Sequence, residues 1–341
     1  MKWFTEPSGK FVIKVPIEWQ YSNARANIPE TSPYSFQLYT NPCGAFQISC
    51  YSAEEKPLNE NVPKQKFDTN NLTFGEFRLA DDGFNTQVWG ATVEDHTIIA
   101  KYICDTKRAS DPEVIAELKK AKEALSTVQL LSPGKRKLAH DLDKYEKFMA
   151  SLFASFDLKV QAMENVSLIE FSIITANQID AYLRLAIVMR EQLDGKTDEL
   201  DIKYLYQKET DEPIIERKIY KKAKLLGIID KAIFSELNSL YSWRNKMVHR
   251  YIISEFRSRD LLDIGRRYEE NCEKVRLILR GIEDQQFKEG VGIYGNGQHP
   301  HAKPTSDALR LLHSQVNDKH LTKDFEREIT FTNAGDERRF L

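Results

Sequence analysis

Four polar residues near the end of one predicted helix have the types and spacing for phosphate chemistry. Arg244, Asn245, His249 and Tyr251 lie within one short stretch of the chain. A guanidinium holds a phosphate with two parallel donors. An imidazole titrates near neutral pH, so it can carry a proton to or from a reacting oxygen. RNA supplies its own nucleophile in the 2′-hydroxyl, so these groups are sufficient in type to cut an RNA backbone without a metal.

The helix that must position these groups is predicted over residues 230–252. Its apolar residues recur at helical spacing, and Arg244 falls near the middle of the face that they form. An ideal helix places Arg244 and His249 roughly 140° apart and about 7.5 Å along the axis. The two side chains therefore meet only if the helix unwinds near His249 or if the working pair forms between two chains. The apolar residues are Ile233, Leu237, Leu240, Tyr241, Met247 and Val248.

The pattern Arg-x4-His-x-Tyr, formed by Arg244, His249 and Tyr251, resembles the motif of the HEPN family of all-helical domains. The resemblance extends over residues 138–288. It implies a metal-independent endoribonuclease without a cofactor, usually a homodimer that brings two motifs together, and often part of a toxin–antitoxin or phage-defence system. It implies catalytic roles for Arg244, His249 and the adjacent Asn245. In some family members a separate partner enzyme modifies the motif tyrosine with nucleotides, so Tyr251 is implied as a regulatory site.

A structural role for Arg244 is the alternative. Asp180 is surrounded by apolar residues on the predicted helix 160–194, much as Arg244 is on its own helix. Two opposite charges in apolar faces predict a buried ion pair between the helices. Removing one partner of such a pair typically costs about 3–5 kcal/mol. Arg244 would then be needed for folding without touching RNA.

Five helices are predicted after a polar hinge at residues 132–137, which contains Ser132, Pro133 and Gly134. The helix at 160–194 is apolar on most sides and should be the buried one. Residues 289–341 are predicted to be a glycine-rich loop followed by a short helix. Basic residues near the motif form either a local phosphate-tracking surface or a solvated face. The helices are expected near 138–157, 160–194, 213–226, 230–252 and 257–288, and the basic residues are Arg217, Lys218, Lys221, Lys222, Lys224, Lys246, Arg250, Arg257 and Arg259.

The first part of the chain, residues 1–131, predicts an α+β domain. Two-residue alternation interrupted by turn residues is typical of antiparallel strands, and Asp111-Pro112 then opens a helix. The passage from Phe11 to Trp19 reads F-x-I-x-V-P-x-x-W and resembles the PsbP-like α/β sandwich, a fold that implies binding and no catalysis. The expected strands are 11–15, 35–39, 45–51, 74–80, 84–93 and 97–104.

Composition sets the broad class of the protein. The 341 residues are 41% hydrophobic and 29% charged, with a formal net charge of −2. This balance is typical of a globular chain of two domains and argues against a dedicated duplex-DNA binder. With no apolar opening segment, a cytoplasmic location without membrane contact is expected. The spacing of Cys43, Cys50, Cys104 and Cys272 predicts buried thiols without a metal, and His299 and His301 have no third metal ligand at a useful spacing.

The fold class predicted is therefore an α+β sandwich, with an antiparallel sheet and a helix, followed by an all-α helical bundle. Three functions remain open. The first is a homodimeric endoribonuclease that acts on RNA. The second is a non-catalytic dimerising or partner-binding scaffold in which Arg244 pairs with Asp180. The third is an immunity-like or antitoxin-like protein that binds a cognate toxin through its first domain.

Overall fold

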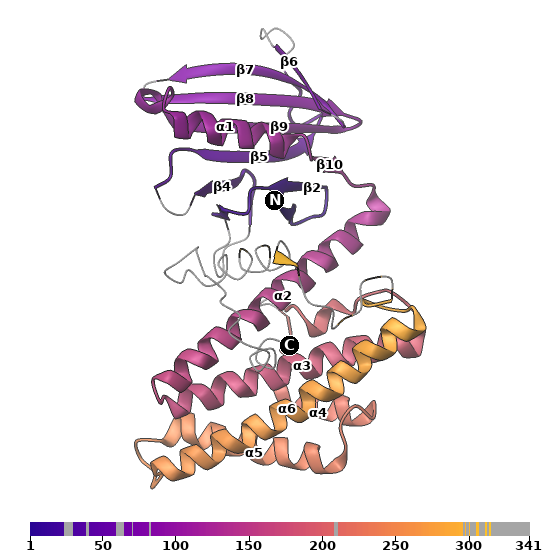
Figure 1. Ribbon diagram of the computed structural model, residues 1–341. Helices are drawn as coiled ribbons and strands as arrows, with labels where there is room; N and C mark the ends of the chain where they lie inside the picture. Colours follow the sequence, from indigo (N-terminus) through magenta and orange to yellow (C-terminus); the bar gives the residue numbers. More distant parts are fainter. Residues whose placement is uncertain are drawn as a thin grey trace. The chain divides into compact units, whose positions relative to one another are not determined.

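The computed structural model describes residues 1–23, 30–38, 41–58, 65–69, 71–81, 83–207, 211–295, 297, 300, 305–306, 311 and 314 (Figure 1). It divides into two compact units. The first contains residues 1–143 together with Ser306, Leu311 and Ser314, and the second contains the described residues between 144 and 305. Strands come first and helices follow, which confirms the predicted mixed α+β class.

The first unit is built on antiparallel sheets. Seven strands pair in the order β3-β4-β5-β9-β8-β7-β6, and three more pair in the order β1-β2-β10. The longest pairing joins β8 to β9 from Phe84↔Asp105 to Val93↔His96. The strands are β1 Lys2–Thr5, β2 Phe11–Val15, β3 Trp19–Tyr21, β4 Tyr34–Leu38, β5 Ala45–Ser52, β6 Gln65–Asp68, β7 Thr73–Asp81, β8 Phe84–Val93, β9 His96–Asp105 and β10 Gln129–Leu130.

Helix α1 (Pro112–Leu125) lies across one face of the seven-stranded sheet (Figure 1). Its inward residues Val114, Ala121 and Leu125 are buried with the sheet residues in one core. A buried hydrogen bond of 2.5 Å from Trp19 Nε1 to Glu117 Oε2 ties the helix to β3. Because the indole and the carboxylate satisfy each other, this polar contact can lie inside the core without leaving either group unpaired.

The second unit is helical. Helix α3 is its most buried element, as predicted, and α6 packs along its length. The residues predicted as a hinge mostly belong to α2, which begins at Pro133, because a proline suits the first turn of a helix. The helices are α2 Pro133–Glu164, whose residues up to Asp143 belong to the first unit, α3 Leu168–Gly195, α4 Glu216–Leu225, α5 Lys231–Arg250 and α6 Ser258–Glu289. The 3-10 turn η2 (Ile202–Tyr204) also lies in the second unit, and the 3-10 turn η1 (Thr106–Arg108) lies in the first.

The loop after α6 is bound to α3 by two buried glutamines. Gln286 Nε2 donates to Gln192 Oε1 at 2.8 Å and to the carbonyl of Met189 at 3.1 Å. Gln286 Oε1 accepts from the backbone N–H of Tyr294 at 3.3 Å. The first residues beyond α6 are therefore part of the helical unit. His299 and His301 lie outside the described residues.

The carboxyl of Glu283, beside this loop, predicts a pH dependence of stability. Burial raises its pKa from 4.5 to about 7, the neighbouring Asp284 adds to the shift, and Arg280 opposes it. The folded state binds this proton more tightly than the unfolded state. The protonated carboxyl therefore adds to the free energy of unfolding below pH 4.5, and this stabilisation is lost as the pH rises to about 7. The free energy of unfolding should fall by at most about 3 kcal/mol over this interval. Urea unfolding at both ends of the interval measures it, and Glu283→Gln should flatten the profile. An equally steep profile in the variant would contradict this assignment.

Candidate functional site

Helix α5 carries the predicted motif and begins at a formed cap. Asp230 accepts a hydrogen bond from the backbone N–H of Ile233 at 2.8 Å, which satisfies one of the free N–H groups of the first turn. Leu237, Leu240 and Met247 are buried. Arg244 is on the same side of the helix as these residues, as the spacing predicts.

Arg244 is held by a carboxylate from another helix. Its Nη1 lies 2.5 Å from Oε2 of Glu216, the first residue of α4, and the two side chains are 15% and 13% exposed. Burial alone would lower the pKa of Arg244, but the Glu216 carboxylate raises it above its ordinary value. The hydroxyl of the buried Tyr220 donates to the other oxygen of Glu216. The guanidinium also stacks on Tyr241, with Cζ 4.8 Å from the ring centroid.

Asp180 has a different partner, which corrects the predicted Asp180–Arg244 pair. Its Oδ2 lies 2.6 Å from Nε of Arg184, one turn later on α3. The rest of that guanidinium donates to the carbonyls of Tyr204 and Ile214, at 3.0 and 2.6 Å. Asp180 and Arg244 thus lie in one polar cluster but do not pair with each other. Arg184 is four residues from Asp180 on the same helix, a spacing that brings the two side chains together.

Two buried oxygens in this cluster have no hydrogen-bond partner among the described residues, Oδ1 of Asp180 and the hydroxyl of Tyr268. Burial raises the pKa of Asp180, and the charge of Glu216 adds to the shift, while Arg184 and Arg244 oppose it. Burial also raises the pKa of Tyr268. The cluster therefore contains two ion pairs, one within α3 and one between α4 and α5, with the unpaired hydroxyl of Tyr268 on α6 near the second.

The other three motif residues lie near the end of α5. Asn245 Oδ1 accepts from Arg244 Nη2 at 3.3 Å, so these neighbours are in contact. His249 is exposed in the last turn, and Tyr251 follows the helix with 44% of its surface exposed. Val248, predicted in the apolar face, is also 44% exposed. Val248 lies on the predicted face but in the last turn of α5, where the core no longer covers it.

The regularity of α5 decides between the two predicted routes to a working pair. The helix continues unbroken to Arg250, so it does not unwind at His249. Arg244 and His249 are therefore about 140° apart around the axis within one chain. A site that uses both must combine side chains from two chains or act at separate points on the substrate.

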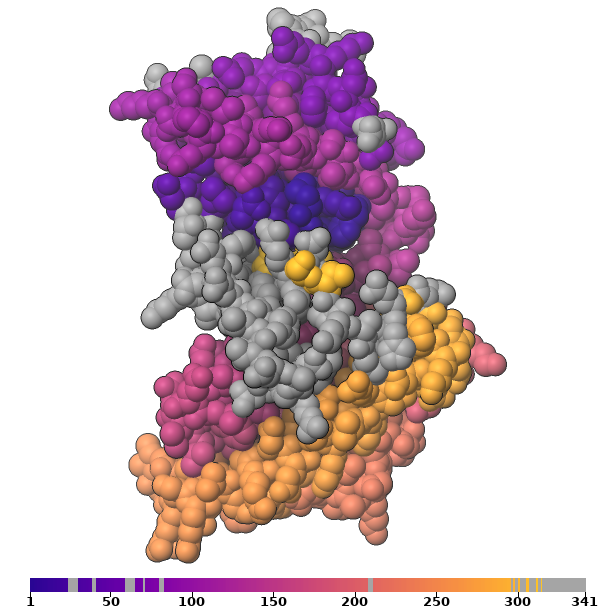
Figure 2. Space-filling model, viewed as in Figure 1, coloured from indigo at the N-terminus to yellow at the C-terminus, as the bar shows by residue number. Residues whose placement is uncertain are grey.

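An exposed apolar segment follows the motif directly. Ile252 and Ile253 are 95% and 82% exposed and follow the exposed Val248 and Tyr251 in the chain. In Figure 2 the orange side chains of the connection between α5 and α6 form the lower-left end of the helical unit. Large apolar residues this exposed and this close together mark an interaction surface more often than a solvated one.

Sequence patterns did not identify Glu216, Tyr220 or Tyr268 as members of the cluster. Glu216 has the position of an ordinary acidic residue in a first helical turn, and 28 residues separate it from Arg244. No periodicity relates two residues on different helices. Of the contacts in the cluster, the i,i+4 spacings of Asp180 with Arg184 and of Glu216 with Tyr220 could be read from the chain, but the contact between α4 and α5 could not.

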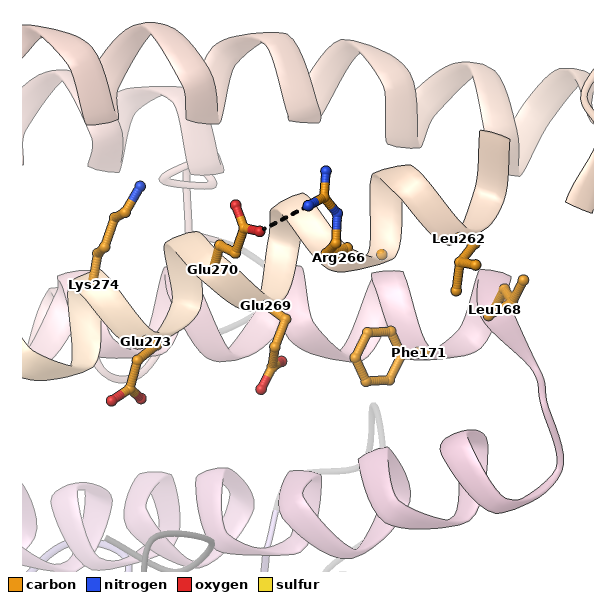
Figure 3. A pocket seen from close by; sticks show the side chains of 9 residues that line it. Leu168, Phe171, Leu262, Arg266, Glu269, Glu270, Glu273 and Lys274 are labelled. Atoms are coloured by element: carbon orange, nitrogen blue, oxygen red, sulfur yellow. Dashed lines mark ion pairs between the residues drawn. The ribbon is translucent and has the colours of Figure 1, made fainter. Parts of the chain in front are cut away.

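A groove on α3 and α6 is separate from the motif. It measures about 790 Å³ and is lined by Leu168 and Phe171 of α3 and by one side of α6 between Leu262 and Lys274. Figure 3 shows Phe171 facing α6, with Arg266 paired to Glu270 at 3.5 Å. The carboxylates along its rim have cationic partners on α2 or α6, and none of the four motif residues lines it.

Within the described residues, no three His, Cys, Asp or Glu side chains group as metal ligands, and no helix is long and apolar enough to cross a membrane. No protein-family model matches the chain, and no curated protein matches it significantly. A solved structure from Bacteroides thetaiotaomicron VPI-5482 is 12% identical over 51% of this chain and 76% of its own, with a TM-score of 0.30. That similarity is too low to support a conclusion about fold or function.

Proposed function

We propose that this protein is a metal-independent endoribonuclease, of the type found in toxin or phage-defence systems, that acts as a homodimer. The observation that carries the proposal is the position of His249, which is exposed at the end of α5 between Val248 and the exposed apolar residues that follow Arg250. A second copy that covers these apolar side chains would bring two motifs together at one surface.

The proposed reaction uses the substrate's own nucleophile. The imidazole of His249 accepts the proton of the 2′-hydroxyl as its oxygen attacks the adjacent phosphorus, and the bond from phosphorus to the 5′-oxygen breaks. The protonated imidazole, or His249 of the partner subunit, returns a proton to the leaving 5′-oxygen. The products are a 2′,3′-cyclic phosphate and a 5′-hydroxyl. Lys246 and Arg250, both exposed beside His249, add positive charge for the phosphate.

Arg244 has a restricted part in this proposal. Its charge is already neutralised by Glu216 at 2.5 Å, so direct contact with the phosphate requires that ion pair to open. While the pair is closed, Arg244 supports the site by fixing α4 against α5. Asn245, which accepts a hydrogen bond from Arg244, lies between the pair and His249 along the chain.

Cleavage in the presence of a chelator tests the proposal. The full-length protein, incubated with single-stranded RNA in excess EDTA, should give fragments with 2′,3′-cyclic phosphate and 5′-hydroxyl ends, and light scattering should show a dimer at the same concentration. Intact RNA across a wide range of protein concentration, from a sample that is folded and dimeric, would rule out the nuclease. Fragments with 3′-hydroxyl ends would indicate a different chemistry.

A non-catalytic scaffold is the second candidate, and the Arg244–Glu216 pair favours it. An arginine held in a buried network is explained by packing of α4 against α5 alone. Under this reading the exposed apolar residues after α5 serve only for association, and replacing His249 leaves every measurable property unchanged. RNA cleavage that depends on His249 therefore separates the two candidates.

A further inference from the structure

Helix α4 carries a row of unpaired positive charges along one exposed side. Arg217, Lys221 and Lys224 are spaced at i, i+4 and i+7, so they lie on one stripe of the helix. All three are exposed, and none has an ion-pair partner among the residues that the structure describes. The other two lysines of the helix differ, because Lys218 pairs with Glu212 at 2.6 Å and Lys222 pairs with Glu191 at 2.8 Å.

Aromatic rings of α5 hold two of these charges in place. The Arg217 guanidinium lies 4.6 Å from the ring centroid of Tyr241, and Lys224 Nζ lies 4.6 Å from that of Phe234. Arg217 Nη2 also donates to Ser242 Oγ at 3.1 Å. A cation seated on a ring keeps its charge while losing side-chain freedom before any ligand binds. The row is therefore partly ordered for an anionic partner.

The contacts also fix the direction of the row. Arg217 meets Tyr241 and Lys224 meets Phe234, so α4 runs antiparallel to α5 and the row follows one side of α5. Ser242, which contacts Arg217, is seven residues before His249, so the two side chains lie on the same side of α5 about 10.5 Å apart. The row thus leads from Lys224 through Arg217 toward His249.

We propose that Arg217, Lys221 and Lys224 bind consecutive phosphates of single-stranded RNA and guide the strand to His249. This inference rests on the proposed function and adds the path of the substrate to it. The row is short, about 10.5 Å from end to end, which suits a few phosphates of one strand. Unpaired cations interleaved with partly exposed aromatic rings are the combination that binds single strands without reading their sequence. The overall net charge of −2 means that this binding must come from the local row.

A binding measurement on an uncleaved strand tests the row. The His249→Ala protein is titrated into a fluorescein-labelled single-stranded RNA in EDTA, and anisotropy is recorded over a series of salt concentrations. Adding Lys221→Ala and Lys224→Ala should weaken binding about tenfold or more at low salt, and it should reduce the slope of log affinity against log salt by about 1.4, from two lost phosphate contacts. Circular dichroism should remain unchanged, because both lysines are exposed.

The matched control is Lys218→Ala with Lys222→Ala, which removes the same charge from the same helix. Those lysines are already paired, so the salt slope should stay that of the parent. Equal losses of RNA affinity in the two double variants would show a general effect of charge and would contradict the proposal. Absence of RNA binding by the parent protein would contradict it too. Preferential binding to vesicles containing phosphatidylserine, lost in the Lys221/Lys224 variant, would assign the row to a membrane surface and also overturn the proposal. If RNA binds with the predicted salt slopes but the wild-type protein does not cleave it, the RNA-binding role of the row is supported and the proposed nuclease activity is rejected.

Discussion

Replacing Arg244 with methionine is expected to lower the free energy of unfolding of the helical unit by about 3–5 kcal/mol. Methionine fills much of the same volume, but it leaves Glu216 Oε2 without its cation in a site where that side chain is only 13% exposed. The remaining hydrogen bond from Tyr220 does not neutralise the carboxylate. Urea unfolding followed by circular dichroism measures the loss.

A double-mutant cycle isolates the pair from the packing. Combining Arg244→Met with Glu216→Gln removes both charges and should destabilise the protein by less than the sum of the single changes. Lys246→Met is the matched control, because that residue is exposed on the same helix, and it should change stability by no more than about 0.5 kcal/mol. A loss from Arg244→Met as small as the control's would mean that the ion pair contributes nothing to the fold.

The second large effect concerns activity. Under the proposed function, His249→Ala should reduce the rate of RNA cleavage by about 10²–10⁴-fold, the usual contribution of a positioned proton-transfer group. Stability should change by no more than about 0.5 kcal/mol, because His249 is exposed. Initial rates of cleavage in EDTA, with unfolding curves on the same samples, measure both quantities.

His140→Ala is a suitable control for that experiment. His140 is a half-buried histidine on α2 and contacts Asp141 at 3.3 Å. Its replacement should leave the cleavage rate unchanged. Undiminished cleavage by His249→Ala would remove this histidine from the mechanism. Lost cleavage in an Arg244 variant, by contrast, supports a catalytic role only if the variant is shown to be folded.

Much of the fold could be predicted from local patterns. Strand β8 and strand β2 have the predicted bounds, and the five predicted helices correspond to α2 through α6 with shifts at their ends. Long alternating or periodic segments record which face is buried, and that signal is local. Strands β1, β3, β6 and β10 were not predicted, because two to four residues are too few to show alternation.

The site was predictable only in part, for the same physical reason. The buried position of Arg244 followed from its apolar neighbours on α5. Its partner did not, because Glu216 comes from a separate helix whose placement depends on how α3, α4 and α5 pack together. The apolar surroundings of Asp180 predict it as the partner of Arg244, but Arg184 on the same helix pairs with it instead. Pairing between helices is a property of tertiary structure, and one chain's spacing does not encode it directly.

The two carbonyl contacts of Arg184 have a consequence for how this protein can change over evolution. One guanidinium binds the chain at Tyr204 and again at Ile214, just before α4 begins. The start of α4 is therefore anchored to α3 independently of the number of residues that join those two points. A change in the number of residues between Tyr204 and Ile214 can therefore leave Glu216 in place beside Arg244.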